Sequence, residues 1–222
     1  MDVRVAPDAA TAGEVAAAFI ARVLQAAIRE HGHATVAFSG GRSPEGMLSD
    51  LAARGLPWPR VGVWQVDERV APDGDSARNA ALLAPLGAAG ARLHLMPVTA
   101  ANRAAARRRY ATSLPTRFDV VHLGLGDDGH TASWPPGTDV AEQPGDVAWC
   151  PLYAGHERLT LTAATVNRAR RRLVLVSGPS KAVPLEGWLL GDPALPVQHV
   201  RRGGTVLVVD AAAAARLPGV AG

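Results

Sequence analysis

A short apolar segment that ends in glycines, carboxylates and a histidine constrains the fold of this chain most strongly. The stretch Phe118-Asp-Val-Val-His-Leu-Gly-Leu-Gly-Asp-Asp-Gly-His130 contains an apolar run over residues 120–125, which is typical of a buried strand. Buried parallel strands of open α/β sheets present ligand-binding groups at their carboxyl ends. We therefore expect one strand, one tight turn and one histidine at the rim of a sheet.

The glycines of this turn, at positions 124, 126 and 129, match the dinucleotide-binding pattern G-x-G-x-x-G. That pattern needs a helix directly after it, because the helix N-terminus holds the pyrophosphate. The proline pair at 135 and 136 stops any long helix within two turns. The glycines could also serve only to supply positive φ angles, but that interpretation leaves the adjacent Asp-Asp pair and His130 unexplained. We expect no dinucleotide cofactor here.

Size and composition fit one large α/β domain spanning residues 1–222. The chain has 222 residues, of which 48% are hydrophobic, and a formal net charge of +3. Two arginine runs, 107–109 and 170–172, lack interleaved aromatic residues, so we expect solvated helix faces rather than nucleic-acid patches. The only cysteine, Cys150, excludes an intramolecular disulfide and is expected to be a small buried hydrophobe.

The N-terminal region carries no targeting pattern. Residues 1–30 include acidic residues and no basic-then-apolar signal sequence. No uninterrupted apolar run approaches the roughly 20 residues that a membrane span needs. We expect a cytoplasmic protein with no membrane partner.

Apolar periodicity predicts strands that alternate with helices. The predicted helices cover residues 8–30, 77–86 and 100–111 and the segments that follow 44 and 181. The predicted strands cover 34–38, 61–66, 93–96, 120–125, 147–152, 173–176, 198–200 and 205–209, with another beginning at 158. This alternation predicts a Rossmann-like α/β fold: a three-layer, doubly wound, mainly parallel sheet with helices on both faces.

A glycine pair between the strand at 34–38 and the next helix predicts an anion site. Two glycines let the backbone approach a phosphate, and the amides of the helix N-terminus point at it. Pro44 suits the first turn of that helix and Ser43 its N-cap. An ordinary strand-to-helix turn explains the segment equally well. The candidate phosphate-binding residues are Ser39, Gly40, Gly41, Arg42 and Ser43.

Charged residues elsewhere add candidates. The run Asp67-Glu-Arg69 follows a predicted strand, which would bring it beside the Gly-Gly loop in a parallel sheet. We expect Arg78 in the first turn of a helix capped by Ser76, where a cation is mildly unfavourable unless an anion binds. Lys181 is the only lysine, which favours a site that needs a compact ammonium group over chance survival.

Taken together, these motifs resemble those of the 6-phosphogluconolactonase family, in the wider group that includes glucosamine-6-phosphate deaminases. They occur in family order between about residues 35 and 185, and their combination is more specific than any one of them. The matching motifs are Ser39-Gly-Gly-Arg-Ser-Pro44, Asp67-Glu-Arg69, Ser76-Ala-Arg-Asn79, Gly124-Leu-Gly-Asp-Asp-Gly-His-Thr-Ala-Ser133, Arg158-Leu-Thr-Leu-Thr162 and Gly178-Pro-Ser-Lys181.

Within this group the lactonases are the better match. The similar deaminases carry a glutamate in an Asn-Glu-Pro-Gly segment soon after the histidine, where this chain has Trp134-Pro-Pro-Gly137. The lactonases usually have Leu-Phe-Pro there, so this chain departs from both subgroups in what is expected to be a pocket wall. Arg42-Ser43 also replaces a common Ser-Thr pair, which changes the expected phosphate loop.

The resemblance implies hydrolysis of a phosphosugar lactone, 6-phospho-D-glucono-1,5-lactone, to 6-phospho-D-gluconate in the pentose phosphate pathway. A lactone is an activated ester, so one general base that deprotonates water is sufficient, with no cofactor or metal. His130, with an ordinary pKa of about 6.5, is the expected base. Asp67, Asp127 and Asp128 compete to orient it. The expected oxyanion donors are Gly126 and Gly129, and the expected phosphate ligands outside the loop are Arg78, Arg158 and Lys181.

Other functions stay open at this point. A sugar-phosphate isomerase or deaminase would use the same phosphate loop with Asp67 as the base. A non-catalytic sugar-phosphate-binding module would keep the loop without turnover, and a nicotinamide oxidoreductase is a distant fourth. No nucleophile-elbow pattern supports a Ser or Cys nucleophile. The sequence allows a monomer or a small homo-oligomer.

Overall fold

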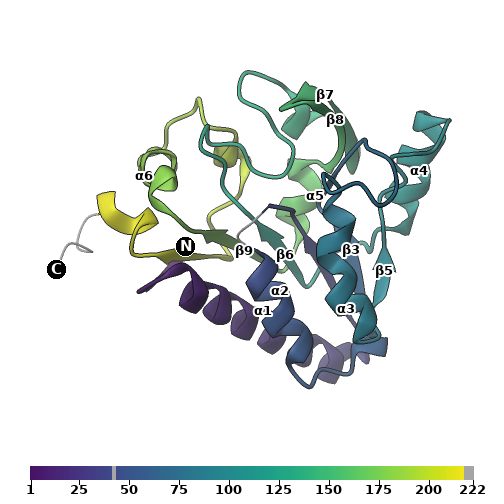
Figure 1. Cartoon of the computed structure of the whole chain (residues 1–222), viewed down its shortest axis with the longest axis horizontal. Helices are drawn as coiled ribbons and strands as arrows, with labels where there is room; N and C mark the ends of the chain where they lie inside the picture. Colours follow the sequence, from purple (N-terminus) through teal and green to yellow (C-terminus); the bar gives the residue numbers. More distant parts are fainter. Residues whose placement is uncertain (42–43, 218–222) are drawn as a thin grey trace.

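The computed structural model describes residues 1–41 and 44–217 and is built on a seven-stranded, fully parallel sheet (Figure 1). This arrangement confirms the predicted doubly wound α/β fold. Across the sheet the strands are β1 (Asp2–Ala6), β10 (Thr205–Asp210), β9 (Arg171–Val176), β6 (Val120–Leu123), β2 (Ala34–Phe38), β3 (Val61–Gln65) and β5 (Arg92–His94).

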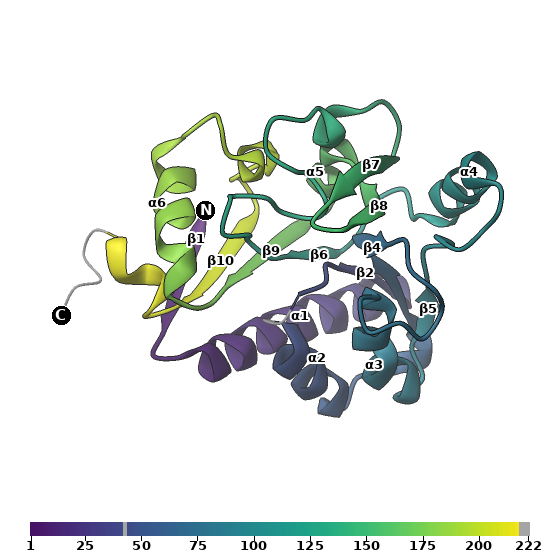
Figure 2. The same cartoon turned by 45° about the horizontal axis from the view of Figure 1, so that its top comes forward.

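Helices cover both faces of this sheet, which gives three layers (Figure 2). One face is covered by α1 (Ala9–His31), α2 (Pro44–Ala53) and α3 (Ala84–Ala88). The other face carries α4 (Arg103–Ser113), α5 (Ala163–Arg168) and α6 (Ala182–Leu190). Short 3-10 helices cover Trp58–Arg60, Asn79–Leu83, Val140–Glu142, Pro179–Lys181, Pro196–His199 and Ala213–Arg216.

The strands alternate between the two hydrophobic layers because successive side chains of a strand point to opposite faces. In β2, Val36 and Phe38 pack with α1 and α2, whereas Ala37 packs in the opposite layer. All five residues of β2 and of β3 are buried. Strands buried on both faces read as continuous apolar runs, which is why the sequence predicted them well.

A second, three-stranded antiparallel sheet stands over the carboxyl ends of the central strands. Its order is β4 (Asp67–Arg69), β8 (His156–Leu161) and β7 (Val147–Tyr153). The sequence predicted the strand content of β7 and β8 but not their separation from the main sheet. Three charged residues of this small sheet, Asp67, Arg69 and Arg158, line the same cavity as Gly40 and Gly41 of the Gly-Gly loop.

The direction of winding reverses between β2 and β6. From β2 the chain builds β3 and β5 on one side, whereas β6, β9 and β10 follow on the other. Ligands of doubly wound sheets bind outside the carboxyl ends of the strands at such a switch point. The Gly-Gly loop follows β2 and the histidine turn follows β6, so both predicted motifs flank this point.

Three local predictions were wrong. Ser76 does not cap a helix. Instead, the buried carboxylate of Glu68 accepts hydrogen bonds from the backbone amides of Asn79 and Ala80 at the start of a 3-10 helix. The predicted strand at 198–200 is part of a 3-10 helix that begins at Pro196. The arginine run 170–172 lies at the start of β9 rather than on a helix, although 107–109 does lie on α4 as expected. Strand β1 had no sequence prediction.

Helix α1 is long and apolar enough, by length and composition, to cross a membrane, although its sequence contains no uninterrupted apolar run of that length. However, 56% of its most apolar window is buried inside the molecule. Ile20 and Leu24 are fully buried in the layer beneath the sheet. Its apolar composition is therefore explained by its position in the core.

Candidate functional site

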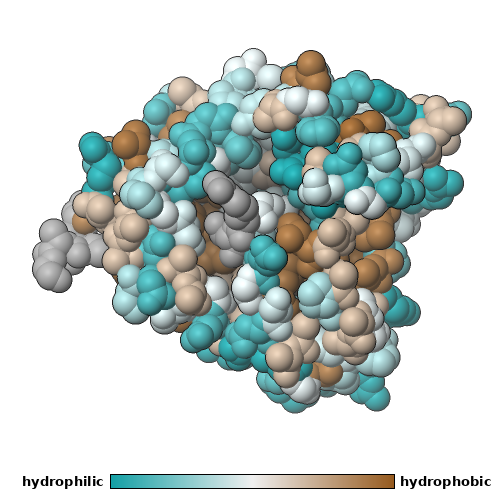
Figure 3. All heavy atoms as spheres, viewed as in Figure 1, coloured by the Kyte–Doolittle hydropathy of each residue, from teal (hydrophilic) through white to brown (hydrophobic). Residues whose placement is uncertain are grey.

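A cavity of about 1060 Å³ opens at the switch point and is lined by residues from both predicted motifs. Figure 3 shows the surface of the molecule in the orientation of Figure 1, coloured by hydropathy. Of the residues that the sequence singled out, ten line this cavity: Ser39, Gly40, Gly41, Asp67, Arg78, Gly126, Asp127, His130, Arg158 and Lys181. The fold therefore gathers segments from five parts of the chain into one space: residues 39–41, 67–78, 126–130, 158 and 181. Arg42 and Ser43 fall outside the described residues.

The Gly-Gly loop is held close to the segment that follows the small sheet's first strand. A Cβ atom on Gly40 would lie 1.9 Å from Oδ1 of Asn79, so the close approach needs a glycine. Gly41 has a φ of +112°, which also favours glycine. These two requirements explain the glycine pair and leave the backbone exposed to the cavity.

Asp67 is buried against two serines rather than against the histidine. Its Oδ1 accepts a hydrogen bond from Oγ of Ser39 at 2.9 Å, and its Oδ2 accepts one from Oγ of Ser133 at 2.8 Å. Asp67 is only 3% exposed. The carboxylate thus ties the Gly-Gly loop to the histidine turn, and it does not contact His130 directly.

His130 is positioned by Asp128 and by a tyrosine that the sequence analysis did not select. Nδ1 of His130 lies 2.6 Å from Oδ1 of Asp128. The hydroxyl of Tyr153, at the end of β7, donates to Oδ2 of Asp128 at 2.5 Å and lies 2.9 Å from Nδ1 of His130. The two rings meet edge to face with centroids 5.4 Å apart.

These contacts set the chemistry of the imidazole. Because the Asp128 carboxylate accepts a hydrogen bond from Nδ1–H, the neutral ring carries its basic lone pair on Nε2. Burial alone would raise the pKa of Asp128, but the hydrogen bonds from Tyr153 and His130 outweigh it and hold that pKa below its ordinary value. Asp128 therefore stays ionised and can stabilise an imidazolium.

Tyr153 was missed because its role depends on a hairpin. β7 and β8 are joined through Ala154 and Gly155, both with positive φ, and this tight turn places Tyr153 opposite His156. The guanidinium of Arg158 packs 5.0 Å from the tyrosine ring centroid. An Ala-Gly turn between two apolar strands was the available signal, but it could not show that the tyrosine faces His130.

Gly126 and Gly129 of the histidine turn shape the backbone of the turn, whereas the sequence predicted them as oxyanion donors. A Cβ on Gly126 would lie 1.9 Å from Nδ1 of His130, and Gly129 has a φ of +81°. The Gly126 amide donates to the carbonyl of His130, and the Gly129 amide donates to the carbonyl of Gly126. Since both amides have backbone partners, this structure does not support them as oxyanion donors. No helix follows between 124 and 137, as the proline pair predicted.

Lys181 also lines the cavity and is paired with the first aspartate of the turn. Its Nζ is 2.5 Å from Oδ1 of Asp127, which also accepts a hydrogen bond from Oγ of Ser180 at 2.8 Å. These two bonds lower the pKa of Asp127. Of the three competing aspartates, Asp127 thus orients Lys181, whereas Asp128 partners the histidine.

The arginines of the cavity differ in what they can offer an anion. Arg158 is 5% exposed, and one of its guanidinium nitrogens donates to the carbonyl of Tyr153. Burial lowers the pKa of Arg158. Arg78 is bound to two carboxylates, Glu68 at 3.1 Å and Asp73 at 2.8 Å, and to a backbone carbonyl. Arg78 therefore lines the cavity with its charge already compensated, which weakens it as a phosphate ligand.

Two further residues of the cavity region were assigned no role by the sequence. Arg69 lines the cavity and donates from Nη1 to the carbonyl of Ala77 at 2.7 Å. His122, on β6, lines the floor; its burial lowers its pKa to about 3, so the ring is neutral. Among the described residues neither ring nitrogen of His122 has a hydrogen-bond partner.

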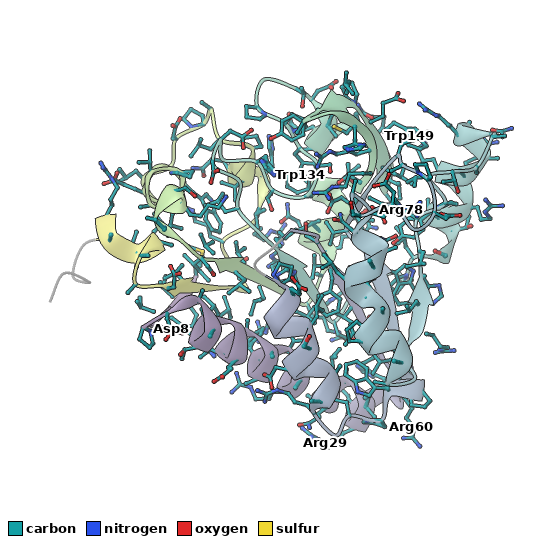
Figure 4. All side chains as sticks on the ribbon, in the orientation of Figure 1. Asp8, Arg29, Arg60, Arg78, Trp134 and Trp149 are labelled. Carbon is teal, nitrogen blue, oxygen red and sulfur yellow. The ribbon has the colours of Figure 1, made fainter. Side chains whose placement is uncertain are left out.

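Trp134 does not form the pocket wall that its position suggested. The side chain is 1% exposed in the core, and its Nε1 donates to the carbonyl of Leu161 at 2.8 Å. Trp134 is labelled in Figure 4. The same view labels Arg78, which lies near the start of the helical segment that leads into α3. The wall beside His130 comes instead from Thr131 and Ala132. Trp134 thus anchors the turn from behind.

Cys150 is buried, as expected, and burial raises its pKa to about 11, so the thiol is neutral. Within residues 1–41 and 44–217, no three His, Cys, Asp or Glu side chains gather as potential metal ligands.

Fold and site together define a doubly wound α/β protein with a cavity of mixed charge and an aspartate-held histidine at the switch point of its sheet. The model of the family described as glucosamine-6-phosphate isomerases/6-phosphogluconolactonase matches residues 7–209. This chain belongs to that family.

Individual relatives agree with this assignment. A 6-phosphogluconolactonase of Synechocystis sp. is 37% identical over 191 residues, which cover 79% of this chain and 79% of that protein. One of Pseudomonas aeruginosa is 37% identical over 200 residues, which cover 84% and 82%. The crystal structure of a 6-phosphogluconolactonase from Shewanella baltica matches with a TM-score of 0.86 over 95% of this chain and 97% of that one. Because the sequence identity to this structure is only 24%, this last match shows similarity of the fold alone.

Proposed function

We propose that this protein hydrolyses 6-phospho-D-glucono-1,5-lactone to 6-phospho-D-gluconate, the lactone-opening step of the pentose phosphate pathway. The observation that carries the proposal is His130, held by Asp128 at 2.6 Å beside a cavity that also contains Lys181 and Arg158. The relatives that are 37% identical to this chain are named 6-phosphogluconolactonases.

In the proposed reaction, Nε2 of His130 takes a proton from water as the water oxygen attacks the lactone carbonyl carbon. The tetrahedral intermediate then collapses and breaks the bond between that carbon and the ring oxygen. The imidazolium returns its proton to the leaving ring oxygen, which becomes a hydroxyl group, and the carbonyl carbon becomes a carboxylic acid that ionises. Asp128 stabilises the imidazolium while it exists.

The phosphate of the substrate is proposed to bind the Ser39–Ser43 loop together with Lys181 and Arg158. Binding a remote phosphate positions the reacting carbonyl and so contributes to the rate. Lys181 exchanges Asp127 for the phosphate when the substrate binds, because the two are ion-paired in this structure. Asp67 supports this arrangement through Ser39 and Ser133 rather than by contacting the base. We propose no role for Arg78 beyond structural support.

We also propose that residues 1–222 act as one lactonase-like domain in the cytoplasm. The partner proposed for this site is the small-molecule substrate: we propose no nucleic acid, membrane, cofactor or metal ion for the reaction. The chain is proposed to act as a monomer or a small homo-oligomer.

The substrate test compares two reactions on one sample. The protein is given freshly generated 6-phosphogluconolactone and, separately, glucosamine 6-phosphate, and both products are identified by NMR with an assay for ammonia. We expect 6-phosphogluconate and no ammonia. Ammonia release would move the assignment to the deaminase alternative, and tight phosphosugar binding without either product would favour the non-catalytic one.

A further inference from the structure

A second cavity of about 730 Å³ lies at the edge of the sheet opposite to the proposed active site. Its lining comes from α5, from the link between α5 and β9, from β9 itself and from the segments that precede β6 and β10. Five of the eleven lining residues are arginines, and none is acidic or aromatic: Arg117, Arg168, Arg170, Arg172 and Arg201. The cavity therefore concentrates positive charge where the proposed function does not use it.

Arg172 lies buried in this cavity and has no carboxylate partner among residues 1–41 and 44–217. It is 2% exposed, and its guanidinium donates to Oγ1 of Thr205 and to the carbonyls of Asn167, Ala169 and Gly203. These acceptors satisfy its hydrogen bonds but carry no net negative charge. Burial makes the largest contribution to lowering the pKa of Arg172, and the positive charges of Arg201 and Arg171 lower it further.

The surrounding arginines are only partly compensated. Arg168 is paired with Asp146 at 2.7 Å, and Arg170 lies 3.4 Å from Asp119. Among the described residues, Arg117 and Arg201 have no ion pair, and positions 42, 43 and 218–222 include no Asp or Glu that could supply one. Like charges confined to one concave surface repel each other, so an anion that binds there is favoured.

We infer that this arginine cavity binds a small polyanion that carries a polyphosphate group. Guanidinium groups bind phosphate oxygens through paired hydrogen bonds, and several of them match several adjacent negative charges. The volume lies within the range of small-molecule sites, roughly 300–1,000 Å³. Single-stranded nucleic acid binding usually adds aromatic stacking surfaces, which this lining lacks.

The test is isothermal titration calorimetry of the full-length protein with inorganic tripolyphosphate and, in a parallel arm, with ATP. The test variant is Arg117→Gln/Arg201→Gln. The matched control is Arg108→Gln/Arg109→Gln, which removes the same charge from exposed positions on α4. Lys181→Gln reports on binding in the main cavity. Arg172 is left intact because its four bonds hold the surrounding loops together.

We expect the test variant to weaken tripolyphosphate binding about tenfold or more, with little change in the control and in Lys181→Gln. Equal affinity for tripolyphosphate and ATP would indicate an inorganic polyphosphate ligand, and tighter ATP binding would indicate a nucleotide. No binding to the wild-type protein would overturn the inference. So would equal losses in the two double variants, or loss of binding in Lys181→Gln. Tighter binding of a single-stranded oligonucleotide than of either probe would also overturn it.

Discussion

At the scale of single residues, the proposed chemistry depends on the different hydrogen-bond partners of the two carboxylate oxygens of Asp128. One oxygen lies 2.6 Å from Nδ1 of His130, and the other accepts a hydrogen bond from the hydroxyl of Tyr153 at 2.5 Å. The sequence could predict the histidine and a carboxylate partner, because both stand in one turn. It could not choose among Asp67, Asp127 and Asp128, since that choice depends on serines 39, 133 and 180 and on Lys181, most of which lie far away in the chain.

Replacement of Tyr153 by Phe tests the part of this network that the sequence missed. Asp128 would lose one hydrogen-bond donor, and its negative charge would then act more strongly on the His130 ring. We expect kcat to fall modestly and the acid limb of the kcat/KM profile to move to higher pH. Thermal stability is the check on folding. An unchanged pH profile would mean that the tyrosine only fills space.

Replacement of Lys181 by Ala tests the proposed phosphate ligand. A hydrogen bond to a charged group contributes about 1.5–3 kcal/mol, so KM is expected to rise roughly 10- to 100-fold while kcat changes little. Steady-state kinetics with the lactone measure both constants. Arg216→Ala, which removes a cation paired with Glu186 outside the cavity lining, serves as the control. A fall in kcat at constant KM would contradict this role for Lys181.

At the scale of elements, the parallel strands other than β1 and the large helices followed from sequence because each is a periodic or continuous apolar pattern. The antiparallel sheet β4-β8-β7 did not, because β4 is three polar residues long and its pairing with β8 is tertiary. Arg78 illustrates the consequence. The helix predicted around it proved to be a 3-10 turn, and buried Glu68 both caps that turn and compensates the arginine.

We expect the activity to depend on the absence of a side chain at Gly126 but not at Gly124, although both glycines belong to the histidine turn. In Gly126→Ala the added Cβ would lie 1.9 Å from Nδ1 of His130 and must displace the ring, so we expect kcat to fall about tenfold or more. In Gly124→Ala the added Cβ meets nothing within 4 Å and activity should stay near wild type. Kinetics and circular dichroism of both variants decide this. Equal activity in the two would show that the turn does not fix the histidine.

At the scale of the whole molecule, charge is divided between the two edges of one sheet. The carboxyl edge holds a mixed site, with carboxylates beside its cations, whereas the cavity at the opposite edge is lined by five arginines and no carboxylate. The doubly wound order brings the motifs after β2 and β6 together, which sequence could anticipate. The arginine cavity could not be anticipated, since the run 170–172 contributes only two of its residues and was expected on a helix.

Buried His122 predicts a pH dependence of global stability. Its pKa is lowered to about 3 in the folded state, while an unfolded chain binds the proton near its ordinary value of about 6.5. Protonation therefore favours the unfolded state, and stability is lost as pH falls from about 6.5 towards 3. The slope for one proton is at most about 1.4 kcal/mol per pH unit. Urea unfolding of wild type and His122→Phe between pH 7.5 and 5 should show a smaller loss in the variant; parallel curves would contradict the account.

The most direct test of the central claim is lactone hydrolysis followed by acid release at constant pH below neutrality, where spontaneous opening is slower. Wild type and His130→Ala are compared on freshly generated 6-phosphogluconolactone. We predict a protein-dependent rate in wild type and a fall of kcat by about 10²–10⁴ in the variant, because general-base assistance is lost. Full turnover by His130→Ala would show that another group is the base, and a wild-type rate equal to background would contradict the proposed function itself.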